Sequence, residues 1–287
     1  MESATAYLLN GQNPDGGWGY TTGNDSFVEP TALAILALKN DPQAAAACQA
    51  GAGWLVNNQN PDGGWGIHRL DPQSGWQTAW AVQALAFFPE RAAACQKGID
   101  WLIHFEPFQI TDTAQLEMGQ KVAAIDFSLR GWPWLPGEAS WIEPTALVIW
   151  TLTGEVAVEE IRARLQEAVQ YMLDRRCAGG GWNVGNPVMF DASLPPRAQP
   201  TAWSLLALAR FAPEVIQEDD LRAMQADMQA DGGPMARAWC LLALRALNSA
   251  DDEQRLSLLD LQSEGGSWGN SLYQTAIAAF ALQEGPF

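Results

Sequence analysis

The sequence predicts an all-α fold, an (α/α)6 barrel in which six inner helices lie within a ring of six outer helices. Three observations support this prediction. Stretches rich in Ala and Leu alternate with amphipathic stretches, a Gly-Gly-Trp turn recurs between them, and the period-two runs that mark β-strands are nearly absent. A helix that is apolar on all sides is buried, whereas a helix with one apolar stripe lies at the surface. We expect a single domain over residues 1–287.

Six stretches are apolar on nearly every side and are predicted to form the inner helices. Pro30, Pro144 and Pro200 open three of them, in the first turn, where a missing N–H costs nothing. Amphipathic stretches such as 44–57 and 158–175 are predicted to form outer helices. The inner helices are expected over residues 30–38, 77–87, 144–152, 200–209, 236–247 and 273–282.

A turn motif separates each outer helix from the next inner helix. GQNPDGGWGY covers residues 11–20, and NNQNPDGGWGI covers residues 57–67. Its glycines supply the positive φ angles that end a helix and reverse the chain, and the Trp can cover the seam between neighbouring helices. The motif therefore predicts the fold and not the chemistry. Further copies include GWPW at 131–134, and weaker ones end at Trp182, Met235 and Trp268.

The composition excludes several classes of function. With 16 Lys and Arg against 33 Asp and Glu, the formal net charge is −17, which argues against binding to nucleic acid or to anionic lipid. No apolar run reaches the ~18–20 residues that span a bilayer, and the start MESATAYLLNGQ lacks the features of a signal peptide. The four cysteines show no Cys-x-x-Cys spacing, so we expect reduced thiols in a cytoplasmic protein.

The repeats resemble the QW motif of squalene–hopene cyclases and oxidosqualene cyclases. In that motif a basic residue and Gly precede an aromatic residue, which is followed at fixed spacing by Gln, Gly and Trp. Repeat four departs from it, with Arg176 at the position of Gln. The resemblance implies the (α/α)6 barrel shared by triterpene cyclases, class II diterpene cyclases and protein prenyltransferase β subunits. The matching residues are Tyr7, Leu8, Gln12, Gly16 and Trp18 in repeat one, Gly51, Trp54, Leu55, Gln59, Gly63 and Trp65 in repeat two, and Gln262, Gly266 and Trp268 in repeat six.

The motifs that carry the known chemistries of these families are missing. The sequence contains no Asp-x-Asp-Asp, which protonates the substrate in the cyclases, and no Asp-x-Cys, which binds zinc in the prenyltransferases. It also lacks the Cys-Gly-Glu-Gln of thioester domains. The two histidines have no Cys or Asp at ligand spacing, so we expect neither a metal nor another cofactor.

Two glutamates occupy the register of the missing acid. When the repeats are aligned on the Thr-Ala that opens an inner helix, Glu29 and Glu143 fall on the middle Asp of the cyclase motif, the proton donor of that family. General-acid catalysis on an alkene needs a neutral carboxyl. An apolar cavity raises a carboxyl pKa by more than a helix N-terminus lowers it. The alternative is that both glutamates only stabilise the helix dipole.

Other residues are expected near the mouth of the barrel. The resemblance implies a His that orients the proton donor, for which His68 is the candidate and His104 a weaker one. Aromatic faces can stabilise a cationic intermediate by ~0.5–2 kcal/mol each, although ordinary packing is the alternative. Asp219 and Asp220 are expected to stabilise the start of an outer helix. The residues expected to contact substrate are Phe27, Trp76, Trp80, Asp126, Trp134, Trp141, Phe190 and Asp191.

These observations predict a metal-independent enzyme, related to class II terpenoid cyclases, that cyclises or isomerises an apolar isoprenoid by protonating it. Two alternatives stay open. One is a non-catalytic barrel that binds a lipid or a protein, and the other is a glycan-active (α/α)6 enzyme with two carboxylates at the rim. A closed apolar pocket would favour the first function, a polar cleft the glycan enzyme, and a filled centre the binding protein. A homodimer is a further expectation.

Overall fold

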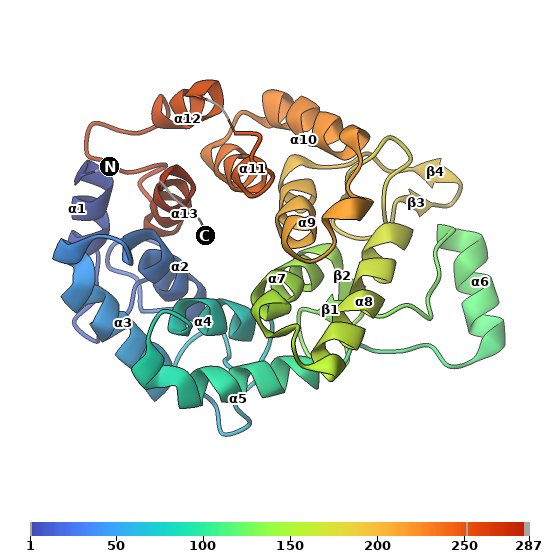
Figure 1. Ribbon diagram of the computed structural model, residues 1–287, viewed down its shortest axis with the longest axis horizontal. Helices are drawn as coiled ribbons and strands as arrows, with labels where there is room; N and C mark the ends of the chain where they lie inside the picture. Colours follow the sequence, from blue (N-terminus) through green and yellow to red (C-terminus); the bar gives the residue numbers. More distant parts are fainter. Residues whose placement is uncertain (1, 251, 284–287) are drawn as a thin grey trace. The chain divides into compact units, whose positions relative to one another are not determined.

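The computed structural model describes residues 2–250 and 252–283. These residues form thirteen α-helices, four short 3-10 helices and four two-residue strands (Figure 1). The chain forms two compact units. Unit 1 comprises Met1–Leu102, Arg237–Leu241 and Ala250–Phe287, and unit 2 comprises Ile103–Ala236 and Leu242–Ser249. The expectation of a single domain stays a prediction.

Unit 1 is built around α2, whose residues are all buried. Helix α2 packs against α13, α4 and α3, and α13 also packs against α1 (Figure 1). Other helices surround α2 because it is apolar on every side. The helices of this unit are α1 (Glu2–Asn10), α2 (Val28–Leu38), α3 (Ala45–Asn57), α4 (Gln77–Leu85), most of α5 (Ala92–Ile103), α12 (Asp252–Leu259) and α13 (Leu272–Leu282).

Unit 2 is built around α7 and α9, which pack against each other. Helix α8 packs on α7, and α10 packs on α9. Helix α11 (Pro234–Ala246) contributes residues to both units. The elements of unit 2 are α6 (Thr113–Ala123), β1 (Trp132–Pro133), β2 (Ser140–Trp141), α7 (Ile142–Leu152), α8 (Glu159–Asp174), β3 (Val188–Met189), β4 (Ala192–Ser193), α9 (Ala198–Phe211) and α10 (Glu218–Asp231).

The predicted inner helices are confirmed as helices, and the buried side chains are concentrated in α2, α4, α7, α9, α11 and α13. One helix, α6, was not predicted. It lies in the part of repeat three where the repeat pattern is interrupted, and the Asp112 side chain caps it by accepting from the Gln115 backbone N–H at 2.9 Å. Within the described part of the chain, no helix has the length and apolar character needed to cross a membrane.

The Trp of the turn motif bonds to the helices on both sides of it, as repeat one shows. Its backbone N–H donates to the Thr hydroxyl at the start of the following inner helix, at 2.9 Å for Trp18 and Thr31. Its indole Nε1–H donates to a backbone carbonyl of the preceding outer helix, at 2.8 Å for Trp18 and Leu8. The same Trp-to-Thr bond occurs at Trp65–Thr78, Trp132–Thr145, Trp182–Thr201 and Trp268–Thr275.

The turn requires a glycine for two reasons, its backbone conformation and the close approach of neighbouring atoms. Gly16 has a φ of 94°, which is rare for residues with a side chain, and a Cβ there would lie 2.8 Å from the Ala50 carbonyl oxygen. Gly63 repeats this arrangement in the second copy, with a φ of 95°. The structure therefore accounts for the Gly-Gly-Trp motif by helix termination and close packing.

Repeat four uses a different residue to hold its turn. In repeat one the Asp15 carboxylate accepts from the Gly17 backbone N–H at 3.1 Å, within the turn itself. In repeat four the fully buried Asp220 accepts from the Gly181 N–H at 2.8 Å and forms an ion pair with Arg176 at 3.3 Å. Asp220 also caps α10, as expected for an acid at a helix start. Asp220 thus stabilises the turn and the start of α10, and Asp219 forms an ion pair with Arg222 in the same helix.

Candidate active site

Glu29 lies in the first turn of α2, and its side chain is buried, with a relative exposure of 6%. The backbone of Phe27 is extended and leads directly into this turn. Two phenol hydroxyls donate to the carboxyl group, Tyr20 Oη to Oε2 at 2.8 Å and Tyr273 Oη to Oε1 at 2.9 Å. Each carboxyl oxygen therefore has one tyrosine partner.

The repeat itself brings these three residues together. Tyr273 stands two residues before Thr275 in α13, and Glu29 stands two residues before Thr31 in α2, so both occupy the same register. Because α2 and α13 pack against each other, equivalent positions at their starts become neighbours. The Tyr20 backbone carbonyl accepts from the Tyr273 backbone N–H at 3.3 Å and from Ser271 Oγ at 3.0 Å, which ties the first turn to the start of α13.

Burial and hydrogen bonding act in opposite directions on Glu29. Burial in apolar surroundings raises the pKa of its carboxyl group to about 7, and the hydrogen bonds from Tyr20 and Tyr273 limit this rise. The pKa of Tyr20 is also raised, first by burial and then by the nearby carboxylate. Glu29 is thus a carboxyl group that exchanges between its neutral and ionised forms near neutral pH.

Tyr20 and Tyr273 belong to an aromatic cluster. The ring centroid of Tyr20 lies 5.1 Å from that of Phe27 and 5.4 Å from that of Tyr273. Phe27 contacts the ring of His68 edge-on at 5.7 Å. His68 does not bond to Glu29, and its Nδ1 accepts from the Leu70 backbone N–H at 3.1 Å. The residues that bond to the Glu29 carboxyl group are therefore Tyr20 and Tyr273, and not His68, which was expected there.

Tyr20 and Tyr273 were not among the residues predicted from the sequence. Two features of the sequence could have indicated them. Tyr20 ends the first copy of the turn motif, and Tyr273 occupies in repeat six the register of Glu29 in repeat one. Only the packing of α13 on α2, at opposite ends of the chain, brings these positions into contact.

Glu143 occupies the corresponding place in unit 2. It lies in the first turn of α7 and is partly buried. Trp141 precedes it with a relative exposure of 36%, and Trp134 is partly buried in the loop before β2. The structure thus places three predicted residues of repeat three in one segment.

Three other predicted residues are exposed. Asp126 was expected to enter the cavity, but its side chain is exposed and Oδ1 accepts from the Ser128 N–H at 2.8 Å and Oγ–H at 2.6 Å, which lowers its pKa. Phe190, 78% exposed, and Asp191, also exposed, form the turn of the β3–β4 hairpin with φ angles of 50° and 62°. A sharp turn with two positive φ angles directs these residues to solvent and does not fit the expected contact with substrate.

The tryptophans of α4 differ in their surroundings. Trp80 is fully buried, and its ring lies 6.0 Å from that of Trp239, which fits the packing alternative. Trp76 is partly buried and immediately precedes α4. His104, the weaker of the two His candidates, is exposed. Among the described residues, no group of three or more His, Cys, Asp or Glu side chains is placed to hold a metal ion.

Comparison with known proteins agrees with the sequence pattern. Residues 1–112 match the family model of the squalene-hopene cyclase C-terminal domain. No curated protein matches the sequence. The type II terpene cyclase MstE from Scytonema is 19% identical, with a TM-score of 0.64 over 98% of this chain and 96% of that chain. A variant of MstE with its substrate geranylgeranyl dihydroxybenzoate, also 19% identical, matches with a TM-score of 0.63 over 98% and 94% of the two chains.

Carbohydrate-active proteins share the fold as well. An α-amylase from Clostridium perfringens is 11% identical, with a TM-score of 0.69 over 98% of this chain and 97% of that chain. Cellobiose 2-epimerase from Spirochaeta thermophila is 13% identical, with a TM-score of 0.66 over 98% and 93%. At these identities the structural likeness shows the fold alone. The comparisons confirm the all-α fold of the (α/α)6 toroid class and the resemblance of the chain to the terpenoid cyclase superfamily.

Proposed function

We propose that the protein is a metal-independent terpenoid cyclase or isomerase that protonates an apolar isoprenoid, with Glu29 as the general acid. The observation that supports this most strongly is the buried Glu29 carboxyl group, held by Tyr20 and Tyr273 and with a pKa raised to about 7. A carboxyl group of this kind is neutral in a large fraction of molecules at neutral pH, as a proton donor must be.

In the proposed reaction, the Glu29 carboxyl proton forms a C–H bond at one end of a carbon–carbon double bond, and the other carbon becomes cationic. A second double bond of the same chain attacks the cation and closes a ring. Loss of a proton from a neighbouring carbon to solvent gives an isomer of the substrate, and solvent reprotonates Glu29. The hydroxyls of Tyr20 and Tyr273 stabilise the carboxylate formed in the first step.

The aromatic cluster supports the cationic part of this sequence. Tyr20 and Tyr273 bond to the acid, Phe27 packs on Tyr20, and an aromatic face can stabilise a cation by ~0.5–2 kcal/mol. His68 would contribute through its contact with Phe27. MstE, which shares the fold, has geranylgeranyl dihydroxybenzoate as its substrate, and this supports an isoprenoid as the class of substrate here.

Product analysis tests the proposal. The purified protein is incubated in D2O with geranylgeraniol, geranylgeranyl diphosphate and squalene, and products are analysed by mass spectrometry. We expect a cyclic isomer that carries solvent deuterium at the protonated carbon. Glu29→Gln should reduce turnover by about 10²–10⁴-fold, the range for loss of a general acid. Glu143→Gln, at the same register in unit 2, is the matched control and should retain turnover within a few-fold. Full turnover by Glu29→Gln would refute the role of Glu29.

The likeness to an α-amylase and an epimerase favours one alternative, a glycan-active enzyme. The same preparation is therefore incubated with maltooligosaccharides and with cellobiose. Hydrolysis or epimerisation that Glu29→Gln abolishes would place the acid in carbohydrate chemistry. Saturable binding of an isoprenoid without turnover would favour the non-catalytic barrel.

A further inference from the structure

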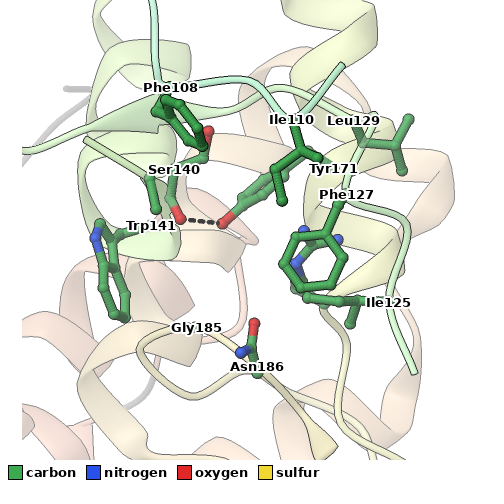
Figure 2. Close-up of a pocket in the computed structure, with 12 residues that line it drawn as sticks. Phe108, Ile110, Ile125, Phe127, Leu129, Ser140, Trp141, Tyr171, Gly185 and Asn186 are labelled. Carbon is green, nitrogen blue, oxygen red and sulfur yellow. Dashed lines mark hydrogen bonds between the residues drawn. The ribbon is translucent and has the colours of Figure 1, made fainter. Parts of the chain in front are cut away.

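A pocket lies within unit 2, apart from Glu29 and its tyrosines. Its volume is about 180 Å3, and its walls come from five separate parts of the chain (Figure 2). These are the two segments on either side of α6, the β2 strand, the C-terminal end of α8 and the loop before β3. Two of these walls belong to the insertion that interrupts repeat three. The repeat pattern therefore does not account for the pocket.

Aromatic rings face the pocket. Figure 2 shows Trp141 and Phe127 on opposite sides of an open space, with Tyr171 and Phe108 toward one end and Asn186 at the other. Trp141 is 36% exposed and Phe108 is 62% exposed, so large apolar surface at the pocket is left in contact with water. Burying such surface against a ligand is favourable.

A glycine lies directly against each of two rings of the lining, those of Trp141 and Phe127. A Cβ at Gly185 would lie 2.9 Å from the Trp141 ring, and a Cβ at Gly119 of α6 would lie 2.7 Å from the Phe127 ring. Both rings therefore rest directly on the backbone, with no side chain between. The two glycines thus fix where these rings lie at the pocket.

Most polar groups of the pocket are already bonded. Tyr171 Oη donates to the Ser140 carbonyl at 2.7 Å. Arg175 forms an ion pair with Asp174 and donates to the Asp126 carbonyl at 3.2 Å, so its charge is compensated. A ligand in this pocket needs no charge of its own, because Arg175, the cation of its lining, is already paired.

One polar atom of the lining has no donor. The Asn186 amide nitrogen contacts Met189 Sδ at 3.3 Å, and no described residue donates to the amide oxygen. In Figure 2 this oxygen points toward the space between Trp141 and Phe127. It is placed to accept from an O–H or N–H group of a molecule in the pocket.

We propose that this pocket binds a small, neutral, monocyclic aromatic compound with a hydrogen-bond donor, of the phenol type. The ring lies between Trp141 and Phe127, and its O–H or N–H group donates to Asn186 Oδ1. A cavity of about 150 Å3 with an apolar lining is large enough for benzene, so 180 Å3 accommodates one substituted ring. Contact with the aromatic rings of the lining favours an aromatic over an aliphatic ring.

Binding of matched probes tests this site. 4-Methylphenol, 4-methylanisole and 4-methylcyclohexanol are titrated into the full-length protein by isothermal titration calorimetry. We expect 4-methylphenol to bind saturably with one site per chain. 4-Methylanisole, which lacks the donor, and 4-methylcyclohexanol, which lacks the aromatic ring, should each bind at least fivefold more weakly. Equal binding of the three compounds, or no binding of 4-methylphenol, would overturn the proposal.

Two variants assign the binding to this pocket. Ala139 lines it in an exposed segment, so Ala139→Trp fills the pocket and should weaken 4-methylphenol binding at least tenfold. Glu138→Trp adds the same side chain one residue away and should leave binding unchanged. Asn186→Ala should remove the preference for 4-methylphenol over 4-methylanisole. Circular dichroism of each variant verifies the fold, and unchanged binding by Ala139→Trp with the native spectrum would place the ligand elsewhere.

Discussion

Glu29 and Glu143 occupy the same place in two repeats and differ in what surrounds them. Both lie in the first turn of an inner helix, two residues before the Thr that bonds to the turn Trp. The loops before them are also paired alike, since Trp18 pairs with Phe27 in repeat one and Trp132 pairs with Trp141 in repeat three. Yet Glu29 is buried between two tyrosines, whereas Glu143 is only partly buried.

The equivalent positions explain part of this difference. Trp134 stands where Tyr20 stands, nine residues before the glutamate in both repeats (134 to 143 and 20 to 29). In the same way Trp141 replaces Phe27. An indole is a hydrogen-bond donor with a large apolar surface, whereas a phenol carries a hydroxyl that can donate and accept. The comparison teaches that the repeat sets the position of the acid and its neighbours set its chemistry.

The largest expected effect is on stability. The pKa of Glu29 is about 7 in the folded protein and ordinarily 4.5, so its proton is held more tightly in the folded state. The stabilisation is complete below pH 4.5 and is lost as the pH rises through 7. Between pH 4.5 and 8, wild type should lose about 3 kcal/mol of unfolding free energy relative to Glu29→Gln. Urea unfolding of both proteins across this pH range measures the difference, and parallel pH profiles would contradict the prediction.

The next effect is on the pH dependence of turnover. If Glu29 must be protonated, kcat/KM should fall roughly 50-fold between pH 7 and pH 9, with a slope that approaches tenfold per pH unit. The rate is measured on the isoprenoid that the wild type converts. Glu143→Gln should keep the same profile. A rate independent of pH in this range would separate Glu29 from the proton transfer.

The tyrosines should shift this profile. Tyr20→Phe or Tyr273→Phe removes one donor to the ionised carboxylate, so the pKa of Glu29 should rise, because these hydrogen bonds lower it in the wild type. A hydrogen bond of this kind is worth about 1.5 kcal/mol, which corresponds to an upward shift of roughly one pH unit in the alkaline limb. A shift to lower pH, or none, would show that the hydroxyls do not stabilise the carboxylate.

The smallest effect is expected at Glu143. Its side chain is partly exposed, so Glu143→Gln should change the unfolding free energy by no more than about 0.5 kcal/mol at any pH from 4.5 to 8. The same urea titrations provide this measurement. A pH-dependent change as large as that of Glu29→Gln would make the two acids equivalent and remove the basis of the comparison.

Much of the fold and part of the site could be predicted from local patterns. The apolar stretches around α2 and α7 identified inner helices, and the alignment on Thr31 and Thr145 identified both acids. The prediction for Asp126 did not match its exposed position, because the sequence between α5 and α7 departs from the repeat and forms the additional helix α6. Where periodicity is lost, the sequence contains no information on which side chains are buried.

The linear sequence was sufficient for every property that depends on neighbours along the chain. These are the helices of the repeats, the glycines and the Trp of the turn motif, and the register of the two glutamates. The properties that depend on residues far apart required the folded chain. Tyr20 and Tyr273 meet at Glu29 because the last helix packs against the first inner helix, and the pKa of a carboxyl group depends on the burial and the donors that this packing creates.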